Sequence, residues 1–211
     1  MKWVVVGGQA RKVGKTSVIA GLIRGLGMFA WTAVKISCHG DEAGSQPVEA
    51  PDELPAHLDF LLSEESNPQG HGDTSLYLAA GARRALWLRT RADGLSRALP
   101  SLLEALVRDE HVIVESNSLL GFLKPDVFLM AVDESGRNLK ASARQFLACA
   151  DAFVAVKLGA APSERPTTRL QVPEGRPVFP VSVGEWSNPD LCRFVSERLG
   201  TPGGADLESL P

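Results

Sequence analysis

The sequence lacks the marks of secreted and membrane proteins. It has three cysteines in 211 residues, and they stand too far apart for a zinc site and are odd in number for a disulfide framework. No apolar run approaches the roughly 20 residues that a membrane-spanning helix needs. The first apolar run, Trp3 to Val6, is too short for a secretory signal. These absences predict a cytoplasmic protein with reduced thiols and no membrane partner.

The composition is that of one ordinary globular domain, but its charges are unevenly distributed. Hydrophobic residues make up 44% of the chain and charged residues 22%, which suits a domain with a sizeable core. The net charge is −3, yet residues 39–74 contain nine acids and no lysine or arginine, so the remaining chain carries +6. The positive charge of the chain outside this stretch suits a phosphate-rich ligand. The acidic stretch is more typical of a solvated or metal-facing segment than of a nucleic-acid-binding surface, so we expect no nucleic-acid partner.

Residues 3–17, WVVVGGQARKVGKTS, combine a short apolar strand, a glycine loop and the start of an amphipathic helix. This order, with Gly14-Lys15-Thr16 at the helix start, is the context of a phosphate-binding P-loop. The loop and the helix N-terminus present backbone N–H groups to an anion. Lys15 is expected on the β- and γ-phosphates, and the Thr16 hydroxyl on Mg²⁺. The nucleotide-binding residues predicted here are Gly8, Arg11, Lys12, Val13, Gly14, Lys15, Thr16 and Ser17.

The spacing of this loop is irregular. The standard motif places four residues between its first glycine and Gly-Lys, which would require a glycine in place of Gln9. Here the nearest glycine is Gly8, and five residues separate it from Gly14. The alternative is a chance Gly-Lys-Thr in a surface turn, and the strand before it and the helix after it argue against that.

Two later strands end in a carboxylate that suits the metal side of such a site. Residues 111–115 end in Glu115 and residues 127–133 end in Asp133, and either fits the Walker B position. The strand pattern alone leaves the choice between them open. Lys35 stands near the carboxyl end of a strand at 31–36, where open α/β sheets bind ligands; a solvated lysine is the alternative.

Residues 38–73 are rich in proline, glycine, serine and acids, and only Ala56 to Leu62 has a helical pattern. A segment this long inside a compact domain is usually a functional lid or disordered, so we expect an acidic, lid-like insert. Three histidines lie in it, His39, His57 and His71. They match no standard zinc spacing, so solvated histidines are favoured over a separate metal site. At its end, Asp73 either caps the helix that begins there or serves the metal.

The rest of the chain alternates between strands and helices. Strands are expected at 85–89, 152–156 and 177–183, the last at a sheet edge because of its prolines, and helices at 73–80, 96–108, 138–149 and 188–199. Such alternation after a P-loop predicts an α/β P-loop NTPase, a mostly parallel sheet with helices on both faces. We expect a single nucleotide-binding domain over residues 1–200 and a loose C-terminal tail at 201–211.

Several of these pieces together resemble the molybdopterin-guanine dinucleotide biosynthesis protein B family. The counterparts of its motifs, in the family's order over residues 3–133, are Gly14-Lys15-Thr16, Val34-Lys35-Ile36 with His39, Asp73-Thr74-Ser75 with Ala80-Gly81-Ala82, and Ile113-Val114-Glu115-Ser116. The chain departs from the family in its five-residue loop, in its shrunken histidine cluster and in the serine after Glu115.

This resemblance implies an accessory protein of molybdenum cofactor maturation that binds GTP or ATP with Mg²⁺ and hydrolyses it slowly. It implies catalytic roles for Lys15 and Glu115, a ligand contact for Lys35, and a metal side formed by Thr16, Asp73 and Glu115. The expected partners are the purine nucleotide, molybdopterin, the nucleotidyltransferase that builds the dinucleotide, and a second copy of the chain in a homodimer.

Two other interpretations remain beside it. The loop from Gly8 to Thr16 and the second-strand Lys35 are also similar to dethiobiotin synthetase, an ATP-dependent ligase in which that lysine serves the substrate. A nucleotide-gated binding protein of unknown cargo is the third. The late strand that carries Asn-Lys-x-Asp in GTPases continues here as Val156-Lys157-Leu158-Gly159, so guanine specificity is not supported and GTP and ATP both stay open.

Overall fold

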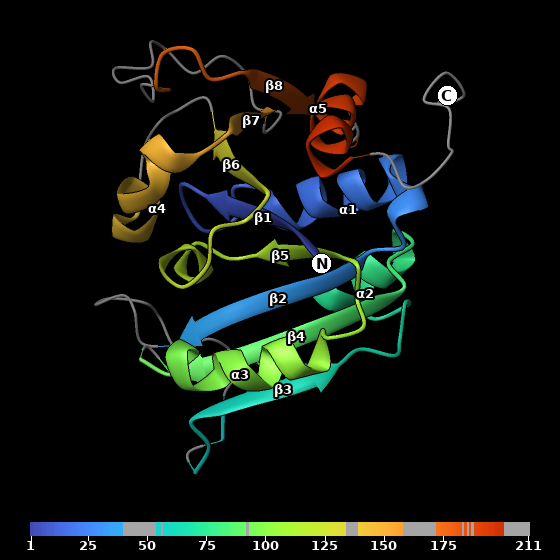
Figure 1. Ribbon diagram of the computed structural model, residues 1–211, viewed down its shortest axis with the longest axis vertical. Coiled ribbons are helices and arrows are strands. Elements are labelled where there is room, and N and C mark those ends of the chain that lie inside the picture. Colours follow the sequence, from blue (N-terminus) through green and yellow to red (C-terminus); the bar gives the residue numbers. More distant parts are fainter. Residues whose placement is uncertain are drawn as a thin grey trace.

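A single eight-stranded sheet forms the centre of the computed structural model, which describes residues 1–39, 54–55, 57–91, 93–133, 139–157, 172–182, 184, 186 and 188–200. The strand order is β3-β4-β2-β5-β1-β6-β7-β8 (Figure 1). The strands are β1 (Lys2–Gly8), β2 (Thr32–His39), β3 (Phe60–Glu64), β4 (Arg84–Arg91), β5 (His111–Glu115), β6 (Val127–Asp133), β7 (Ala152–Lys157) and β8 (Val178–Ser182). All neighbouring strands are parallel except β3, which runs antiparallel to β4.

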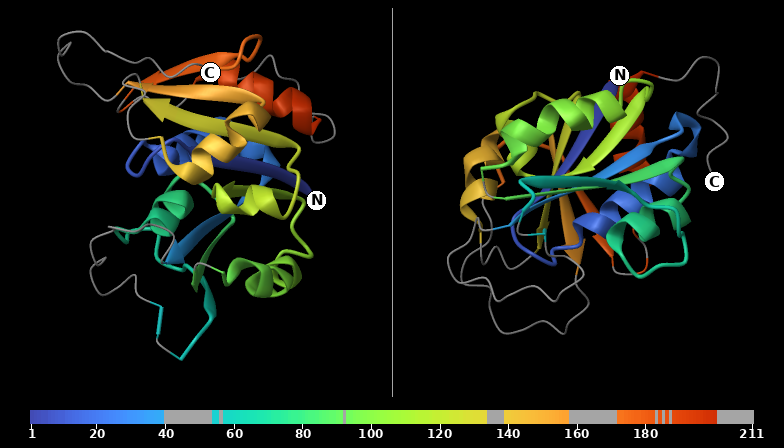
Figure 2. Two further views of the ribbon diagram at one scale, coloured as in Figure 1. Left: turned by 90° about the vertical axis from the view of Figure 1, so that its left-hand side faces the viewer. Right: turned by 90° about the horizontal axis from the view of Figure 1, so that it is seen from below.

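Helices cover both faces of this sheet (Figure 2). They are α1 (Lys15–Gly25), α2 (Asp73–Ala79), α3 (Leu95–Ala105), α4 (Ala141–Phe146) and α5 (Pro189–Leu199). One apolar cluster joins α1, α2 and α5 to one face, and a second joins α3 and α4 to the other. The central strands are buried on both faces, which is why they consist of continuous apolar residues rather than alternating ones. The chain therefore has the expected α/β fold, a mostly parallel sheet with helices on both faces, and its glycine loop lies between β1 and α1.

The two edges of the sheet differ in how well the sequence indicates them. The expected edge position of the last strand is confirmed, because β8 pairs only with β7 and contains Pro180. The helix expected from Ala56 to Leu62 is wrong, because residues 57–59 are not helical and the residues after them form a strand. Residues from Phe60 onward form β3, whose Leu62 lies opposite Leu88 of β4. Leucine favours a helix when it is judged locally, but pairing along the free edge of β4 determines the structure here.

The acids of the 38–73 segment are tied to the body of the protein where the structure describes them. Asp59 forms an ion pair with Arg97 at 3.3 Å, and Glu64 forms one with Arg84 at 2.9 Å. The hydrogen bond from Arg84 lowers the pKa of the Glu64 carboxyl. Within this segment, residues 60–64 form β3 and Asp73 begins α2, and residues 65–72 connect the two. The lid-like role of the segment stays a prediction, and its residues 40–53 lie outside the described part, as does the tail at 201–211.

A buried carboxylate fastens the amino ends of β2 and β4 at the end of the sheet opposite the glycine loop. Asp109 is 3% exposed. It accepts a hydrogen bond from the Thr32 hydroxyl at 2.7 Å and one from Arg84 at 2.8 Å, and it also pairs with Arg83. A buried charge needs such partners to be tolerated.

Within the described residues, no helix is long and apolar enough to cross a membrane.

One glycine of α1 allows a close approach of the chain. A Cβ atom on Gly21 would collide with the backbone carbonyl of Trp186, in the segment that leads into α5. The ring of Trp186 also lies against Gly14, where an added Cβ would meet it at 3.1 Å. The absence of two side chains thus allows this segment to lie directly on the helix that follows the glycine loop.

We expect Gly21→Ala to destabilise the protein although alanine is the better helix former. Overpacking of this kind costs about 1–3 kcal/mol. Gly27→Ala is the matched control, since an added Cβ there meets nothing within 4 Å, and it should leave stability unchanged or raise it by about 0.4–1 kcal/mol. Urea unfolding of both variants measures the difference. Equal stabilities would show that the close contact with Trp186 is relieved without cost.

Candidate functional site

The glycine loop between β1 and α1 has the backbone of an anion-binding turn. Gly14, just before the helix, has φ 95°, and Lys12 has φ 59°. These left-handed conformations favour glycine, and such turns point successive N–H groups into a concavity. A Cβ on Gly8 would meet Cδ of Lys15 and Cγ1 of Val13 at 2.7 Å. The lysine side chain thus folds back across the glycine that ends β1.

Gln9 explains the irregular spacing of this loop. It is 0% exposed and prolongs the pairing of β1, because its N–H donates to Ala131 at 3.0 Å. Its side-chain Oε1 accepts from the N–H of Asp133 at 3.1 Å, and its carbonyl accepts from the N–H of Lys140 at 2.9 Å. A glycine at position 9 could not make the side-chain hydrogen bond to Asp133. Because Gln9 still pairs with β6, the turn of the loop begins after Gln9 and not directly after Gly8.

The carboxylate of Glu115, at the end of β5, is contacted by three donors from two helices, α1 and α2. Lys15 at the start of α1 lies 3.3 Å from Oε1. The Thr16 hydroxyl donates to Oε2 at 2.9 Å, and the hydroxyl of Tyr77 in α2 donates to the same oxygen at 2.5 Å. Glu115 is 8% exposed. The lysine and threonine of the predicted P-loop and the first of the two candidate carboxylates thus meet in one cluster.

Asp133, the competing carboxylate, ends β6 on the other side of β1. Its backbone N–H is bound by Gln9, and its side chain is not among the described residues that line the cavity at the glycine loop. The geometry therefore favours Glu115 over Asp133 as the acid nearest to Lys15 and Thr16.

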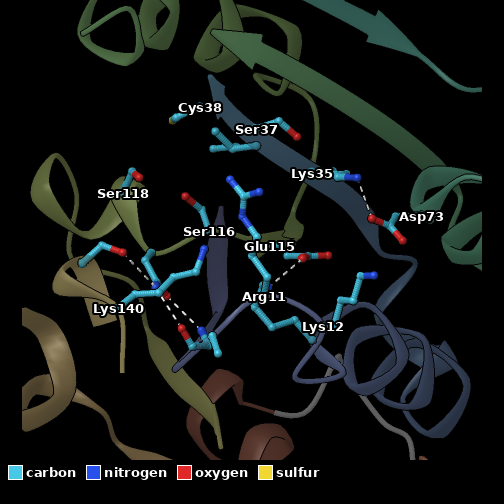
Figure 3. Close-up of a pocket in the computed structure, with 16 residues that line it drawn as sticks. Arg11, Lys12, Lys35, Ser37, Cys38, Asp73, Glu115, Ser116, Ser118 and Lys140 are labelled. Carbon is cyan, nitrogen blue, oxygen red and sulfur yellow. Dashed lines mark hydrogen bonds and ion pairs between the residues drawn. The ribbon is translucent and has the colours of Figure 1, made fainter. Parts of the chain in front are cut away.

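Asp73 reaches the same region from the first turn of α2, where it forms an ion pair with Lys35 of β2 at 2.6 Å (Figure 3). It is not the cap of its helix: the N-cap position is Gly72, without a side-chain cap. Glu65 supports this helix start instead, because it accepts hydrogen bonds from the hydroxyls of Thr74 and Ser75. The capping alternative for Asp73 is therefore wrong.

A cavity of about 450 Å³ opens between the glycine loop and the carboxyl ends of β2 and β5 (Figure 3). It carries more positive than negative side chains. Its lining residues are Gly8, Ala10, Arg11, Lys12, Lys15, Lys35, Ile36, Ser37, Cys38, Asp73, Glu115, Ser116, Asn117, Ser118, Lys140 and Ser142. Seven of the predicted site residues are in this set; Val13, Gly14, Thr16 and Ser17 are not. Val13 is 1% exposed, so its side chain is not available to a ligand.

Asn117 is a site residue that the sequence analysis missed. Its side-chain amide forms two hydrogen bonds with the backbone of Gly8: it accepts from the N–H at 2.9 Å and donates to the carbonyl at 3.0 Å. It also donates to the hydroxyl of Ser142 at 3.3 Å. The run Ser116-Asn117-Ser118 directly after a buried strand was the available signal, because polar residues at that point face the ligand edge of a parallel sheet.

The oxygen donors at Glu115 fit Mg²⁺ better than a transition metal. Mg²⁺ is bound through one or two carboxylates together with phosphate oxygens and water, and not by an all-protein cage. Thr16 and Glu115 present hard oxygen atoms in contact with each other, whereas no group of three His, Cys, Asp or Glu side chains occurs among the described residues. Of the three histidines of the 38–73 segment, His57 and His71 are exposed, and the side chain of His39 lies outside the described part.

Comparisons with known proteins give the chain no family. No protein-family model matches it, and no curated protein matches its sequence. Among solved structures it resembles LpxK from Aquifex aeolicus in complex with ATP, with 18% identity over 85% of this chain and 53% of that one and a TM-score of 0.49. It also resembles HypB from Helicobacter pylori in complex with nickel, with 12% identity over 96% and 92% of the two chains and a TM-score of 0.49. The chain spans about half the length of LpxK, and at these values neither likeness assigns it a ligand or an activity.

Tyr77 makes the cluster sensitive to alkaline pH. Complete burial, and then the charge of Glu115, raise the pKa of its hydroxyl well above the ordinary 10.0. In the unfolded chain this group ionises near pH 10, whereas in the folded protein it keeps its proton. Its contribution to stability is therefore fully present below pH 10 and is lost as the pH rises above that value.

We expect the wild-type protein to lose stability above pH 10 faster than Tyr77→Phe, by about 1.4 kcal/mol per pH unit for the one proton involved. Urea unfolding of both proteins at pH 9, 10 and 11 measures the two slopes. Lysine titration is common to both proteins and cancels in the difference. Parallel slopes would show that Tyr77 ionises normally in the folded state.

Proposed function

We propose that this chain is a Mg²⁺-dependent purine nucleotide-binding protein with slow hydrolysis, which serves the maturation of a molybdenum cofactor. The observation that carries the nucleotide part is the meeting of Lys15, Thr16 and Glu115 at the N-terminus of α1, beside a turn with left-handed residues. This arrangement is suited to a polyphosphate with its cation.

Each member of the cluster has a role in this proposal. The backbone N–H groups of residues 10–14 and the first turn of α1 bind the phosphates, and Lys15 moves from Glu115 to the β- and γ-phosphates. Thr16 and Glu115 would hold Mg²⁺. When bound, Mg²⁺ neutralises charge on the phosphate oxygens. Arg11, Lys12, Lys35 and Lys140 add positive charge around the cavity.

Slow hydrolysis follows from what surrounds the phosphate position. Of the two acids at the cavity, Glu115 serves Mg²⁺ in this proposal, and Asp73 is paired with Lys35. No third carboxylate and no histidine is among the described residues that line the cavity. Phosphoryl transfer depends on positioning and on charge stabilisation, so a cavity without a group committed to activating water is suited to binding more than to turnover.

The molybdenum part of the proposal has a separate source, the ordered motif resemblance over residues 3–133. All four of its segments contribute to the cavity, through Lys15, Lys35, Asp73 and Glu115 with Ser116, and Asp73 also forms an ion pair with Lys35. In this proposal the nucleotide state of the chain controls its association with molybdopterin and with the nucleotidyltransferase, and the chain works as a homodimer.

A ligase resembling dethiobiotin synthetase is the second candidate, and the position of Lys35 favours it. This second-strand lysine faces the cavity beside the glycine loop (Figure 3), where a ligase needs a cation for its substrate. Against it, Lys35 is held by Asp73, and the Asp73-Thr74-Ser75 segment has no counterpart in that family. Incubation with diaminopelargonate, CO₂ and ATP separates the two candidates, since only a ligase would form dethiobiotin.

Calorimetric titration with GTP and with ATP in the presence of Mg²⁺ tests the nucleotide part. We expect binding, and we expect Lys15→Ala to weaken it at least about tenfold, which corresponds to about 1.4 kcal/mol. Lys124→Ala, at an exposed lysine before β6, should leave the affinity unchanged. Equal affinity of wild type and Lys15→Ala would refute a P-loop at this position, and the same titration decides base preference.

The choice of the metal-side acid has its own test. We expect Glu115→Gln to reduce the Mg²⁺ dependence of nucleotide affinity more than Asp133→Asn does, because Glu115 contacts Thr16 whereas Asp133 adjoins Gln9 through its backbone. Nucleotide titrations at several Mg²⁺ concentrations give the two dependences. A larger effect of Asp133→Asn would transfer the metal role to β6 and remove one of the four supports of the family resemblance.

A further inference from the structure

Among the described residues, Tyr77 is the donor to Glu115 that comes from outside the glycine loop and α1. It is 0% exposed and is packed in the apolar cluster between α1, α2 and the sheet. Its hydroxyl donates to Oε2 of Glu115 at 2.5 Å, the same oxygen that accepts from Thr16 at 2.9 Å. Because the phenol is buried, its hydroxyl depends on neighbouring protein groups for a hydrogen bond, and this carboxylate provides one.

We propose that Tyr77 is a positioning residue that holds the carboxylate of Glu115 in place for the metal. The proposal rests on the proposed function, in which Glu115 serves Mg²⁺. It adds a residue of α2 to the site, one that touches neither the nucleotide nor the metal and acts through Glu115.

The argument rests on which donors stay when a nucleotide binds. Lys15 and Thr16 leave Glu115 for phosphate and for Mg²⁺, so two of its three donors are withdrawn at the moment when its position matters. Tyr77 stays, because its ring is buried and its hydroxyl donates to Glu115. Its other neighbour is the Thr16 hydroxyl, which turns to Mg²⁺ in the proposed function, so losing Glu115 would leave a buried hydroxyl poorly satisfied. A carboxylate has about four acceptor positions, so Oε2 can keep the phenol and still face the metal. Without the hydroxyl, only the rotamer preferences of the Glu115 side chain would fix its carboxylate.

Further contacts hold α2, and therefore Tyr77, in register with the site. At the helix start, Glu65 after β3 binds the hydroxyls of Thr74 and Ser75, and Asp73 binds Lys35 of β2. Tyr77 lies one turn further along the same face as Asp73, since residues four apart are neighbours on a helix. The short helix is thus attached to β2, to the segment after β3 and, through Tyr77, to β5.

The first test compares Tyr77→Phe with the wild-type protein in nucleotide titrations with Mg²⁺ and with a chelator. We expect the gain in affinity that Mg²⁺ gives the wild type to fall at least about tenfold in the variant, with chelator-measured affinity unchanged within about twofold. Thr32→Val is the matched control, because it removes another buried hydroxyl that donates to a carboxylate, Asp109, at the other end of the sheet. It should leave both affinities unchanged.

Losses that are equal with and without Mg²⁺, or a Mg²⁺ gain equal to that of the wild type, would overturn the role of Tyr77 and leave the proposed function intact. A wild-type protein whose nucleotide affinity does not depend on Mg²⁺ would overturn both. The two failures are therefore distinguishable in one set of titrations.

A second measurement needs no variant that might fail to fold. Tyr77 is the only tyrosine of the chain, so labelling tyrosine with ¹³C at the hydroxyl-bearing ring carbon gives one NMR resonance from this site. We expect this resonance to shift when nucleotide and Mg²⁺ are added together, because the partners of Glu115 change, and to differ in Glu115→Gln. A resonance that responds to neither would show that the hydroxyl is not engaged with Glu115, and the proposal would be wrong.

Discussion

The ligand edge of this molecule depends on a single nearly buried carboxylate. Glu115 accepts from Lys15, Thr16 and Tyr77, and a charge at this depth is tolerated only with such partners. Because the three donors belong to α1 and α2 and the acceptor belongs to β5, the cluster fixes two helices against the central strands. The arrangement that stabilises the fold around Lys15 and Thr16 is also the one that a polyphosphate would rearrange.

The strand order explains why these groups can meet. β1 lies between β5 and β6, so the ends of both neighbours flank the glycine loop. The β5 side contributes Glu115 and Asn117, and the β6 side takes Gln9 into its ladder through Ala131 and Asp133. The start of the loop is thus held by hydrogen bonds at Gly8 and Gln9, and the residues that follow face the cavity.

The sequence predicted what local pattern determines, and it failed where tertiary contacts decide. The glycine loop, α1, the end of β5 at Glu115 and the edge strand with Pro180 each have a signature within a few residues. β3 has none, because a short leucine-rich segment becomes a strand only through pairing with β4. Tyr77 and Asn117 were missed for the same reason: an aromatic residue in an amphipathic helix and an amide after a strand gain their meaning from Glu115 and Gly8, which are distant in sequence.

The antiparallel direction of β3 determines where the fold can accept changes in chain length. β2 ends at His39, at the carboxyl edge of the parallel strands, and β3 begins at Phe60 opposite Thr90, near the same edge of β4. A parallel edge strand would have required a crossover along the sheet, whereas here the chain leaves and re-enters the sheet at one rim. Closing a longer loop between two such neighbouring points costs little, because the entropy of closure grows only with the logarithm of its length. Insertions and deletions between these strands would therefore leave the core layers undisturbed, and the chain between β2 and β3 is the place where relatives of this protein could diverge most freely.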